Sequence, residues 1–293
     1  MGGARGRTVG SIRCIEPYDF DLSFNLLSRL SGPDRDDDGR IAVWWQGKPT
    51  VIALLETEPA LVEVRARPPA RKATSLMVHL RGILNADLDL KPFYRLAARH
   101  PVLGPAVNRF TGLKPVRPFD LFQMLVIAIT EQQISLVAAA RIRDRVVRRF
   151  GAEVGGLVAF PRPEDLAAAG VADLRACGLS GQKTRYIREI SRMVVDGKID
   201  PLGWGEMPRE ELTETLLGLP GVGRWTVDYL LIRGLGRYDV VPADDLGIRR
   251  MIGELTGRGR HATAAEVEEE LAEWGRWRGM AVFYLLVSTW GQT

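Results

Sequence analysis

Apolar and polar residues alternate along much of the first 90 positions of this 293-residue chain. Three short segments show the alternation best: residues 40–46 (RIAVWWQ), 50–56 (TVIALLE) and 61–67 (LVEVRAR). Each is rich in β-branched or aromatic residues and is bounded by Gly, Pro or Asp, which is typical of strands. Two helical patterns lie beside them, at residues 22–30 and 73–84. The pattern predicts a small antiparallel sheet with helices on one face.

Beyond Pro118 the apolar residues recur every three or four positions, which is the spacing of one face of a helix. Gly or Pro separates the segments, and the sequence predicts helices throughout this part of the chain. They are expected at residues 119–130, 135–150, 163–169, 171–176, 182–196, 209–217, 225–235, 246–255, 264–274 and 279–289. Residues 91–118 are interrupted by Pro and Gly and contain a short helical pattern. The predicted fold class is therefore α+β.

Composition narrows the class of protein further. Apolar residues make up 46% of the chain, but no apolar run reaches the ~18 residues of a membrane-spanning helix. The basic, Gly-rich start lacks the apolar stretch of a signal peptide. We therefore expect a soluble, intracellular protein with no membrane partner. The net charge of +4 and the pI of about 9.2 are a weak indication of an acidic partner.

Cysteine and histidine are too few and too scattered for a metal site or a disulfide framework. A structural zinc ion needs about four convergent ligands, and an iron–sulfur cluster needs about four thiolates. The residues in question are Cys14, Cys177, His79, His100 and His261. We expect no metal and no organic cofactor.

A tight turn joins two of the expected helices in the stretch LPGVGRWTVDYLL, residues 219–231. Gly221 and Gly223 permit positive φ and the close approach of another backbone. Val222 is expected to point between the helices. The free N–H groups at the start of the second helix, with its dipole, make an anion site suited to a phosphate. An ordinary helical hairpin with glycine caps is the alternative.

The complete pattern LPGVGRWT, with a helix on each side, resembles the helix–hairpin–helix element of DNA base-excision glycosylases. Further stretches resemble the AlkA branch, the 3-methyladenine DNA glycosylases of type II. They are residues 15–30 (IEPYDFDLSFNLLSRL), 129–142 (ITEQQISLVAAARI), 242–250 (PADDLGIRR) and 274–286 (WGRWRGMAVFYLL). The resemblance implies a TBP-like N-terminal domain (1–91), a central helical domain with the hairpin (120–237) and a second helical domain (92–119 plus 238–293). The active-site cleft then lies between the two helical domains.

The resemblance also implies the catalytic and base-binding residues. Asp245 stands at the family's catalytic position, and we expect Asp244 to cap the next helix. Trp225 and Tyr229 match aromatic residues of the base pocket, where an electron-rich ring attracts a cationic purine. A second pocket tryptophan of the family falls on Leu286 here. Trp290, Tyr284 or the nearby Phe283 could take its place.

DNA contacts are implied around the hairpin and the QQ motif. Gln133 matches the residue that fills the gap left by the flipped base, with Gln132 as its neighbour. Backbone contacts are expected from the hairpin and from a second phosphate site at Lys183. The hairpin set is Gly221, Val222, Gly223, Arg224 and Thr226. The hairpin carbonyls could also hold a monovalent cation.

The distribution of lysine bears on the type of glycosylase. Of 40 basic residues only six are lysine, and none follows Lys198. Bifunctional relatives use a lysine just past the hairpin as a Schiff-base nucleophile, whereas this chain has Arg224 and Trp225 there, and arginine stays protonated. We therefore expect a monofunctional enzyme, a monomer in the cytoplasm (nucleoid-associated if prokaryotic), that hydrolyses alkylated purines from double-stranded DNA. A glycosylase for hypoxanthine or uracil, or a non-catalytic damaged-DNA-binding protein, remains an alternative.

Overall fold

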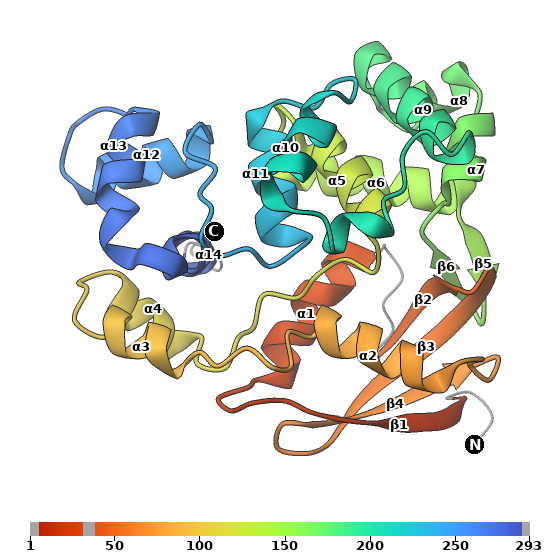
Figure 1. Ribbon diagram of the computed structural model, residues 1–293, viewed down its shortest axis with the longest axis horizontal. Helices are drawn as coiled ribbons and strands as arrows, with labels where there is room; N and C mark the ends of the chain where they lie inside the picture. The colour runs from red at the N-terminus through yellow and green to blue at the C-terminus, as the bar shows by residue number, and fades with distance from the viewer. Residues whose placement is uncertain (1–5, 32–38, 289–293) are drawn as a thin grey trace.

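The computed structural model describes residues 6–31 and 39–288. The N-terminal part of the chain forms a four-stranded antiparallel sheet. The strands are β1 (Arg7–Arg13), β2 (Arg40–Trp45), β3 (Lys48–Glu58) and β4 (Leu61–Arg67), in the order β1-β4-β3-β2. Two helices lie on one side of the sheet, α1 (Phe20–Ser31) and α2 (Ala73–Ile83) (Figure 1). The predicted antiparallel sheet with helices on one face is confirmed.

Alternation explains why the sheet has two different faces, since successive side chains of a strand point to opposite sides. One set packs with Leu76 and Leu80 of α2 in the main hydrophobic core. Its members on the strands are Ile41, Val43, Ile52, Leu54, Val62 and Val64. The opposite set includes Ala42 and Val51, which lie in a second, smaller cluster.

A short hairpin covers that second face, and the expectation of helices throughout the region after Pro118 was wrong here. Strands β5 (Ala152–Val154) and β6 (Leu157–Ala159) are joined by Gly155 and Gly156, both at positive φ. Two glycines with positive φ make the two-residue turn that suits an antiparallel hairpin. Leu157 and Ala159 pack on Ala42 and Val51. The N-terminal sheet is thereby attached to the helical part of the chain.

The remaining elements are helices, and each predicted segment contains one. They are α3 (Lys91–Ala97), α4 (Leu103–Arg109), α5 (Leu121–Glu131), α6 (Leu136–Phe150), α7 (Pro163–Ala168), α8 (Val171–Ala176), α9 (Gly181–Val195), α10 (Arg209–Leu217), α11 (Arg224–Arg233), α12 (Leu246–Leu255), α13 (Ala264–Leu271) and α14 (Arg278–Ser288). Two short 3-10 helices, η1 (Gly203–Gly205) and η2 (Ala272–Trp277), complete the set. Within the described ranges, no helix is long and apolar enough to cross a membrane.

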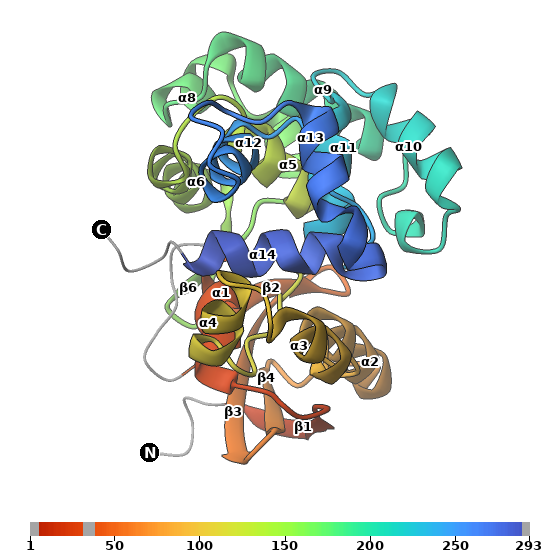
Figure 2. The same cartoon turned by 90° about the vertical axis from the view of Figure 1, so that its left-hand side faces the viewer.

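The helices form two groups. Helices α5 to α11 gather on one side, and α12 to α14 lie over α3 and α4 on the other, as the two views show (Figures 1 and 2). An aromatic cluster joins the second group across the chain, because Phe93 of α3 lies 6.1 Å from Trp274 and 5.3 Å from Tyr284 between ring centroids. The grouping agrees with a second helical domain built from two separate segments, although the exact domain limits stay a prediction.

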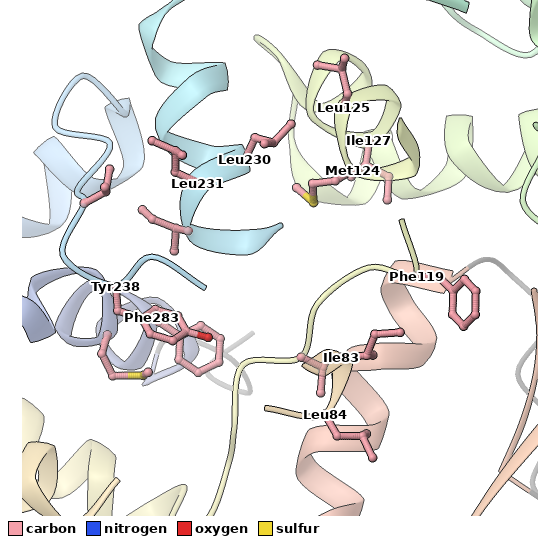
Figure 3. Packing of buried hydrophobic residues seen from close by; sticks show 14 of the residues in the cluster. Ile83, Leu84, Phe119, Met124, Leu125, Ile127, Leu230, Leu231, Tyr238 and Phe283 are labelled. Atoms are coloured by element: carbon pink, nitrogen blue, oxygen red, sulfur yellow. The ribbon is translucent and has the colours of Figure 1, made fainter. Parts of the chain in front are cut away.

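Helix α5 is the centre of the first group. Its residues from Phe122 to Thr130 are all buried, which is expected of a helix that is apolar around its whole circumference. Leu125 of α5 and Leu230 of α11 belong to one core, shown in Figure 3. This packing fixes the end of α5 relative to the start of α11, and the candidate site lies there.

Candidate active site

The turn between α10 and α11 contains one glycine that the structure cannot replace. Gly221 has φ +77°, a region that disfavours residues with a side chain. A Cβ atom at this position would overlap the ring of Tyr186, which comes from α9. Val222 is 8% exposed and packs in the core, as expected. Gly221 therefore lets the turn lie directly on a ring of the neighbouring helix.

The second glycine has a different reason to be there. Gly223 does not use the positive φ that glycine permits: it has an extended backbone with φ −108° and ψ −179° and forms the N-cap of α11. A Cβ atom added to it would meet nothing within 4 Å. No side chain caps the helix at this point. The start of α11 thus presents its backbone to open space, which suits the approach of an anion.

Arg224 and Asp228 form an ion pair one helical turn apart on α11. The Nε atom of Arg224 lies 3.0 Å from both carboxylate oxygens of Asp228. Asp228 has a buried side chain, and burial raises the pKa of its carboxyl while Arg224 opposes the shift. The rest of the Arg224 guanidinium is exposed beside Gly223.

Gln132 joins the hairpin to the end of α5, so the expectation that its side chain inserts into DNA together with Gln133 was wrong. Its Nε2 donates to the carbonyl of Gly221 over 2.9 Å and to Oγ1 of Thr226 over 3.0 Å. Thr226 is 2% exposed, so its hydroxyl depends on this partner. Gln132 is a structural clasp between two elements 89 residues apart.

Lys183 is likewise committed inside the protein, which contradicts a phosphate site at its ammonium group. Its Nζ donates to the carbonyls of Thr130 over 2.9 Å and of Gln132 over 2.6 Å, at the end of α5. Carbonyls at the end of a helix have no partner within it, and a cation there is also stabilised by the negative end of the helix dipole. Burial lowers the pKa of Lys183.

Gln133 stands at the turn between α5 and α6. It has φ +57°, an uncommon conformation for a residue with a side chain, and it is exposed. The residue before it is clasped to the hairpin and Ser135 caps α6. Both sides of the turn are therefore fixed and Gln133 is held at its tip, which agrees with the inserting role that remains a prediction.

Asp245 is held at both carboxylate oxygens. Its Oδ1 accepts the amide of Ile248 over 3.0 Å and caps α12, while its Oδ2 accepts Nε1 of Trp225 over 2.7 Å. The expected division of labour with Asp244 was wrong, because Asp245 is itself the cap and Asp244 is exposed. Because the capping bond restrains Oδ1, the orientation of the carboxylate is set, and Oδ2 is held next to the indole of Trp225.

The rings of Trp225 and Tyr229 stack on one another, with centroids 5.0 Å apart and planes inclined by 13°. Tyr229 donates its hydroxyl to Oε2 of Glu131 over 2.7 Å, and burial raises the pKa of this tyrosine. Sequence reasoning missed Glu131. The only signal was its place directly before the two glutamines of the QQ motif, on the last turn of a helix that is otherwise apolar.

The expected second aromatic residue of the pocket is not Tyr284. Its side chain is fully buried, and its hydroxyl lies 2.7 Å from that of Tyr94 and donates to the carbonyl of Leu113 over 2.8 Å. An aromatic residue on an apolar helix is more often part of the core, and this one is. Trp290 lies outside the described residues, and Leu286 is 39% exposed on α14.

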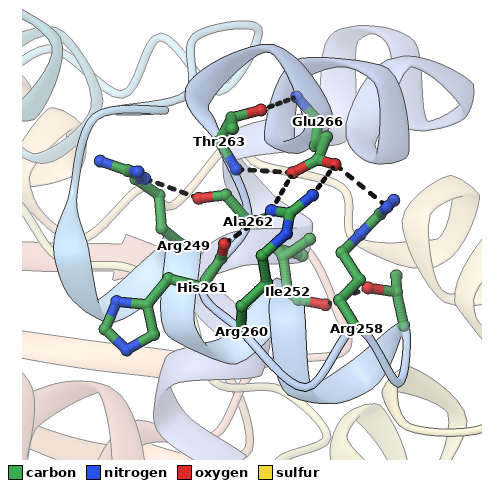
Figure 4. Close-up of polar contacts among 9 residues, drawn as sticks. Arg249, Ile252, Arg258, Arg260, His261, Ala262, Thr263 and Glu266 are labelled. Carbon is green, nitrogen blue, oxygen red and sulfur yellow. Dashed lines mark hydrogen bonds and ion pairs between the residues drawn. The ribbon is translucent and has the colours of Figure 1, made fainter.

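A network of arginines connects the end of α12, the loop after it and the start of α13 (Figure 4). Arg249 donates from Nε to the carbonyl of Ala262 over 2.7 Å. The carboxylate of Glu266 accepts hydrogen bonds from Arg260 over 2.7 Å and from Arg258 over 3.2 Å. Glu266 also forms a capping box with Thr263 at the start of α13. The hydrogen bond from Arg260 is the main cause that lowers the pKa of Glu266 to about 2. The loop between α12 and α13 is thereby closed on itself.

An exposed helix start after a glycine turn, an aromatic pair and a fixed carboxylate together define the site of a helix–hairpin–helix protein that acts on DNA bases. The family comparison agrees with this class. A model described as "HhH-GPD superfamily base excision DNA repair protein" matches residues 126–276, which include α5, the hairpin and α12. The chain belongs to this superfamily.

Individual relatives carry more specific names. The chain is 29% identical to a DNA-3-methyladenine glycosylase of Bacillus subtilis over 218 residues, which is 73% of this chain and 72% of that protein. It is 36% identical to DNA-3-methyladenine glycosylase 1 of Schizosaccharomyces pombe over 60% of this chain and 70% of that one. The structure of a 3-methyladenine DNA glycosylase from Archaeoglobus fulgidus matches with a TM-score of 0.83 at 30% identity, over 97% of this chain and 99% of that one.

Proposed function

We propose that this protein is a monofunctional DNA glycosylase that flips alkylated purines out of duplex DNA and hydrolyses their N-glycosidic bond. The observation that carries the proposal is the contact between Trp225 and Asp245, which brings an aromatic surface and a carboxylate to one place. The relatives named for 3-methyladenine support this class of lesion. Double-stranded DNA containing a damaged base is then the partner.

An alkylated purine suits the aromatic part of the site. Methylation at N3 or N7 gives the base a positive charge, which is attracted to an electron-rich ring face by about 0.5–2 kcal/mol. The same charge makes the base a good leaving group, so strong acid catalysis is not needed. The site therefore has to recognise the charge and stabilise the sugar.

In the proposed reaction, Asp245 acts on the sugar. As the bond between C1′ and the base nitrogen breaks, its electron pair leaves with the base and the deoxyribose acquires oxocarbenium character. The carboxylate stabilises that charge and accepts a proton from the water that attacks C1′. Because the capping bond and the indole fix Asp245 beforehand, little reorganisation is required during the reaction.

We propose hydrolysis without strand cleavage because no lysine follows Lys198 in the sequence. Lys183 contacts Gln132, the residue that is hydrogen-bonded to the hairpin, and its ammonium donates to the carbonyls of Thr130 and Gln132. A lysine that donates to two carbonyls is not free to attack C1′ as an amine. This arrangement supports a water nucleophile.

The proposal includes a monomeric enzyme that works without an organic cofactor or a catalytic metal. The proposal also includes a monovalent cation at the hairpin, which the backbone carbonyls of the turn would hold. The Gly221 carbonyl already accepts from Gln132, so this oxygen would have to serve both partners.

The test is base release from duplex DNA containing 3-methyladenine and 7-methylguanine. We expect the wild type to free methylpurines and to leave the abasic strand uncut, with no adduct trapped by borohydride. Asp245→Asn should reduce release by about 10²–10³-fold and still bind a duplex with an abasic analogue. Asp244→Asn is the matched control and should behave as the wild type. Binding without release by the wild type would instead indicate a damage-binding protein, and release of hypoxanthine or uracil alone would indicate another lesion.

A further inference from the structure

Glu131 is a carboxylate at the site to which neither the family resemblance nor the reaction assigns a role. It is the last residue of α5, its side chain is 9% exposed, and Oε2 accepts the hydroxyl of Tyr229 over 2.7 Å. A buried carboxylate is costly unless it is paired, and a residue placed here only to end a helix would not need to be charged. Its position against the aromatic pair therefore calls for an explanation.

Each of the two stacked rings donates a hydrogen bond to a carboxylate. Trp225 donates the hydrogen of its indole nitrogen to Asp245, and Tyr229 donates the hydrogen of its phenol to Glu131. When an N–H or O–H group donates to an anion, its nitrogen or oxygen gains electron density from the shared hydrogen, and the ring that carries this atom becomes more electron-rich. Both rings of the pair are thus made more electron-rich than a free indole and a free phenol.

We propose that Glu131 determines specificity: acting through Tyr229, it makes the Trp225–Tyr229 pair favour positively charged bases over neutral ones. The inference rests on the proposed function and names the feature of the substrate that this part of the site selects. Glu131 is a positioning residue and does not touch the reacting atoms. An electron-rich ring in a poorly solvated place attracts a cation more strongly, while its attraction for a neutral base is little changed.

Two arginines place positive charge near Glu131 and the ring of Tyr229. Arg143 of α6 lies with NH1 3.5 Å from Oε1 of Glu131, and its side chain is 10% exposed. The guanidinium of Arg233, one turn beyond Tyr229 on α11, lies 5.7 Å from the centre of the tyrosine ring. Removal of Glu131 would leave less negative charge beside the aromatic pair to offset these two cations. The carboxylate therefore also offsets a positive potential that would repel an alkylated purine.

The ion pair of Glu131 and Arg143 offers a test that distinguishes an electrostatic role from a structural one. Glu131→Gln keeps a side chain that accepts the phenol hydrogen but removes the negative charge. Arg143→Gln removes a positive charge from the same pair. If the pair only held α5 to α6, both variants would affect all substrates alike. If charge selects the base, the two variants change the preference in opposite directions.

The measured quantity is the ratio of single-turnover release rates for 7-methylguanine, which is cationic, and hypoxanthine, which is neutral. Binding of duplexes with uncleavable 2′-fluoro versions of the two nucleotides gives the same ratio without chemistry. We expect Glu131→Gln to lower the cationic-to-neutral ratio about three- to tenfold and Arg143→Gln to raise it. Tyr229→Phe, which removes the same hydrogen bond and leaves the carboxylate paired with Arg143, should also lower it.

Each outcome decides something. An unchanged ratio in Glu131→Gln and Tyr229→Phe, or a shift in the same direction in Glu131→Gln and Arg143→Gln, overturns the role of Glu131 and leaves the proposed function standing. If the wild type releases no methylpurine and binds both 2′-fluoro duplexes equally, the proposed function and the inference fall together. If Glu131→Gln does not fold, Tyr229→Phe carries the test.

Discussion

The indole nitrogen of Trp225 donates a hydrogen bond to Oδ2 of Asp245 over 2.7 Å, and so connects the first turn of α11 to the N-cap of α12. The other carboxylate oxygen is already engaged by the amide of Ile248. The Asp245 side chain thereby caps α12 and also accepts a hydrogen bond from the indole of Trp225. The geometry of the proposed catalytic carboxylate depends on the pocket residue, and the two are expected to show coupled mutational effects.

Trp225→Phe tests this coupling because it removes the N–H and keeps an aromatic ring. We expect release of 7-methylguanine to fall about 10-fold, less than for Asp245→Asn, since the carboxylate keeps its capping bond. In an Asp245→Asn background the same substitution should cost less. Trp44→Phe is the matched control, because its indole, on β2 of the N-terminal sheet, donates over 2.9 Å to the carbonyl of Phe160, which follows β6. A tenfold loss in Trp44→Phe as well would mean that the effect is not local.

The two hairpin glycines should respond differently to the same substitution. Gly221→Ala adds a Cβ that overlaps the ring of Tyr186 at a residue with positive φ, so we expect the protein to lose about 1–3 kcal/mol of stability. Gly223→Ala meets nothing within 4 Å and should fold normally. If a DNA phosphate approaches the start of α11, Gly223→Ala will weaken binding of an abasic-analogue duplex.

Chemical denaturation and DNA binding, measured on both glycine variants, separate the two effects. Equal stability losses would contradict the structural difference between the glycines. Unchanged DNA affinity in Gly223→Ala would show that the backbone of this turn is not the surface that receives the phosphate.

The fold could be predicted where the signal is local. Residues 40–46, 50–56 and 61–67 became β2, β3 and β4 because alternation alone places one set of side chains in the core. The hairpin of β5 and β6 was missed because three-residue strands carry almost no periodicity, although Gly155 and Gly156 were its turn signal. The order of the helices could be predicted because apolar residues recur at three- and four-residue spacing within each segment and Gly or Pro separates one segment from the next.

The site was harder to predict because its contacts join residues far apart in the chain. Asp244 and Asp245 are both good caps, so sequence alone cannot decide between them; the structure shows that Asp245 performs the capping that was expected of its neighbour. The bond from Lys183 to Gln132 spans 51 residues and that from Tyr229 to Glu131 spans 98. No local spacing predicts such pairs, and a lysine near a predicted DNA surface is easily mistaken for a phosphate ligand.

The two glutamines before α6 should separate structure from DNA contact. Gln132→Ala leaves the buried hydroxyl of Thr226 and the carbonyl of Gly221 without the amide that now serves them, which should cost about 1–3 kcal/mol of stability. Gln133→Ala removes an exposed side chain and should leave the melting temperature nearly unchanged, because the residue keeps the same backbone strain. If Gln133 fills the gap left by the flipped base, release in this variant falls while binding to an abasic-analogue duplex weakens.

Thermal unfolding and base release on this pair decide the assignment. A stability loss in Gln133→Ala that equals that of Gln132→Ala would show that the tip of the turn is also structural. Full release by Gln133→Ala would transfer the inserting role to another residue.

Glu266 gives the fold a pH dependence whose direction follows from its pKa. Arg260, the backbone of Thr263 and Arg258 hold the pKa of this carboxyl at about 2, below the value of about 4.3 expected in the unfolded chain. The unfolded state therefore binds more protons between these values, so the stabilisation is fully present above about pH 4.3 and is lost as the pH falls toward 2. Glu266→Gln should be less stable than the wild type at pH 7, and the difference should shrink across that window. Urea unfolding at a series of pH values measures it, with Glu269→Gln, an exposed residue of the same helix, as the control. A difference that stays constant from pH 7 to pH 3 would mean that the network around α12 and α13 stabilises the fold through its packing, and that the ionised carboxylate is not what closes the loop between the two helices.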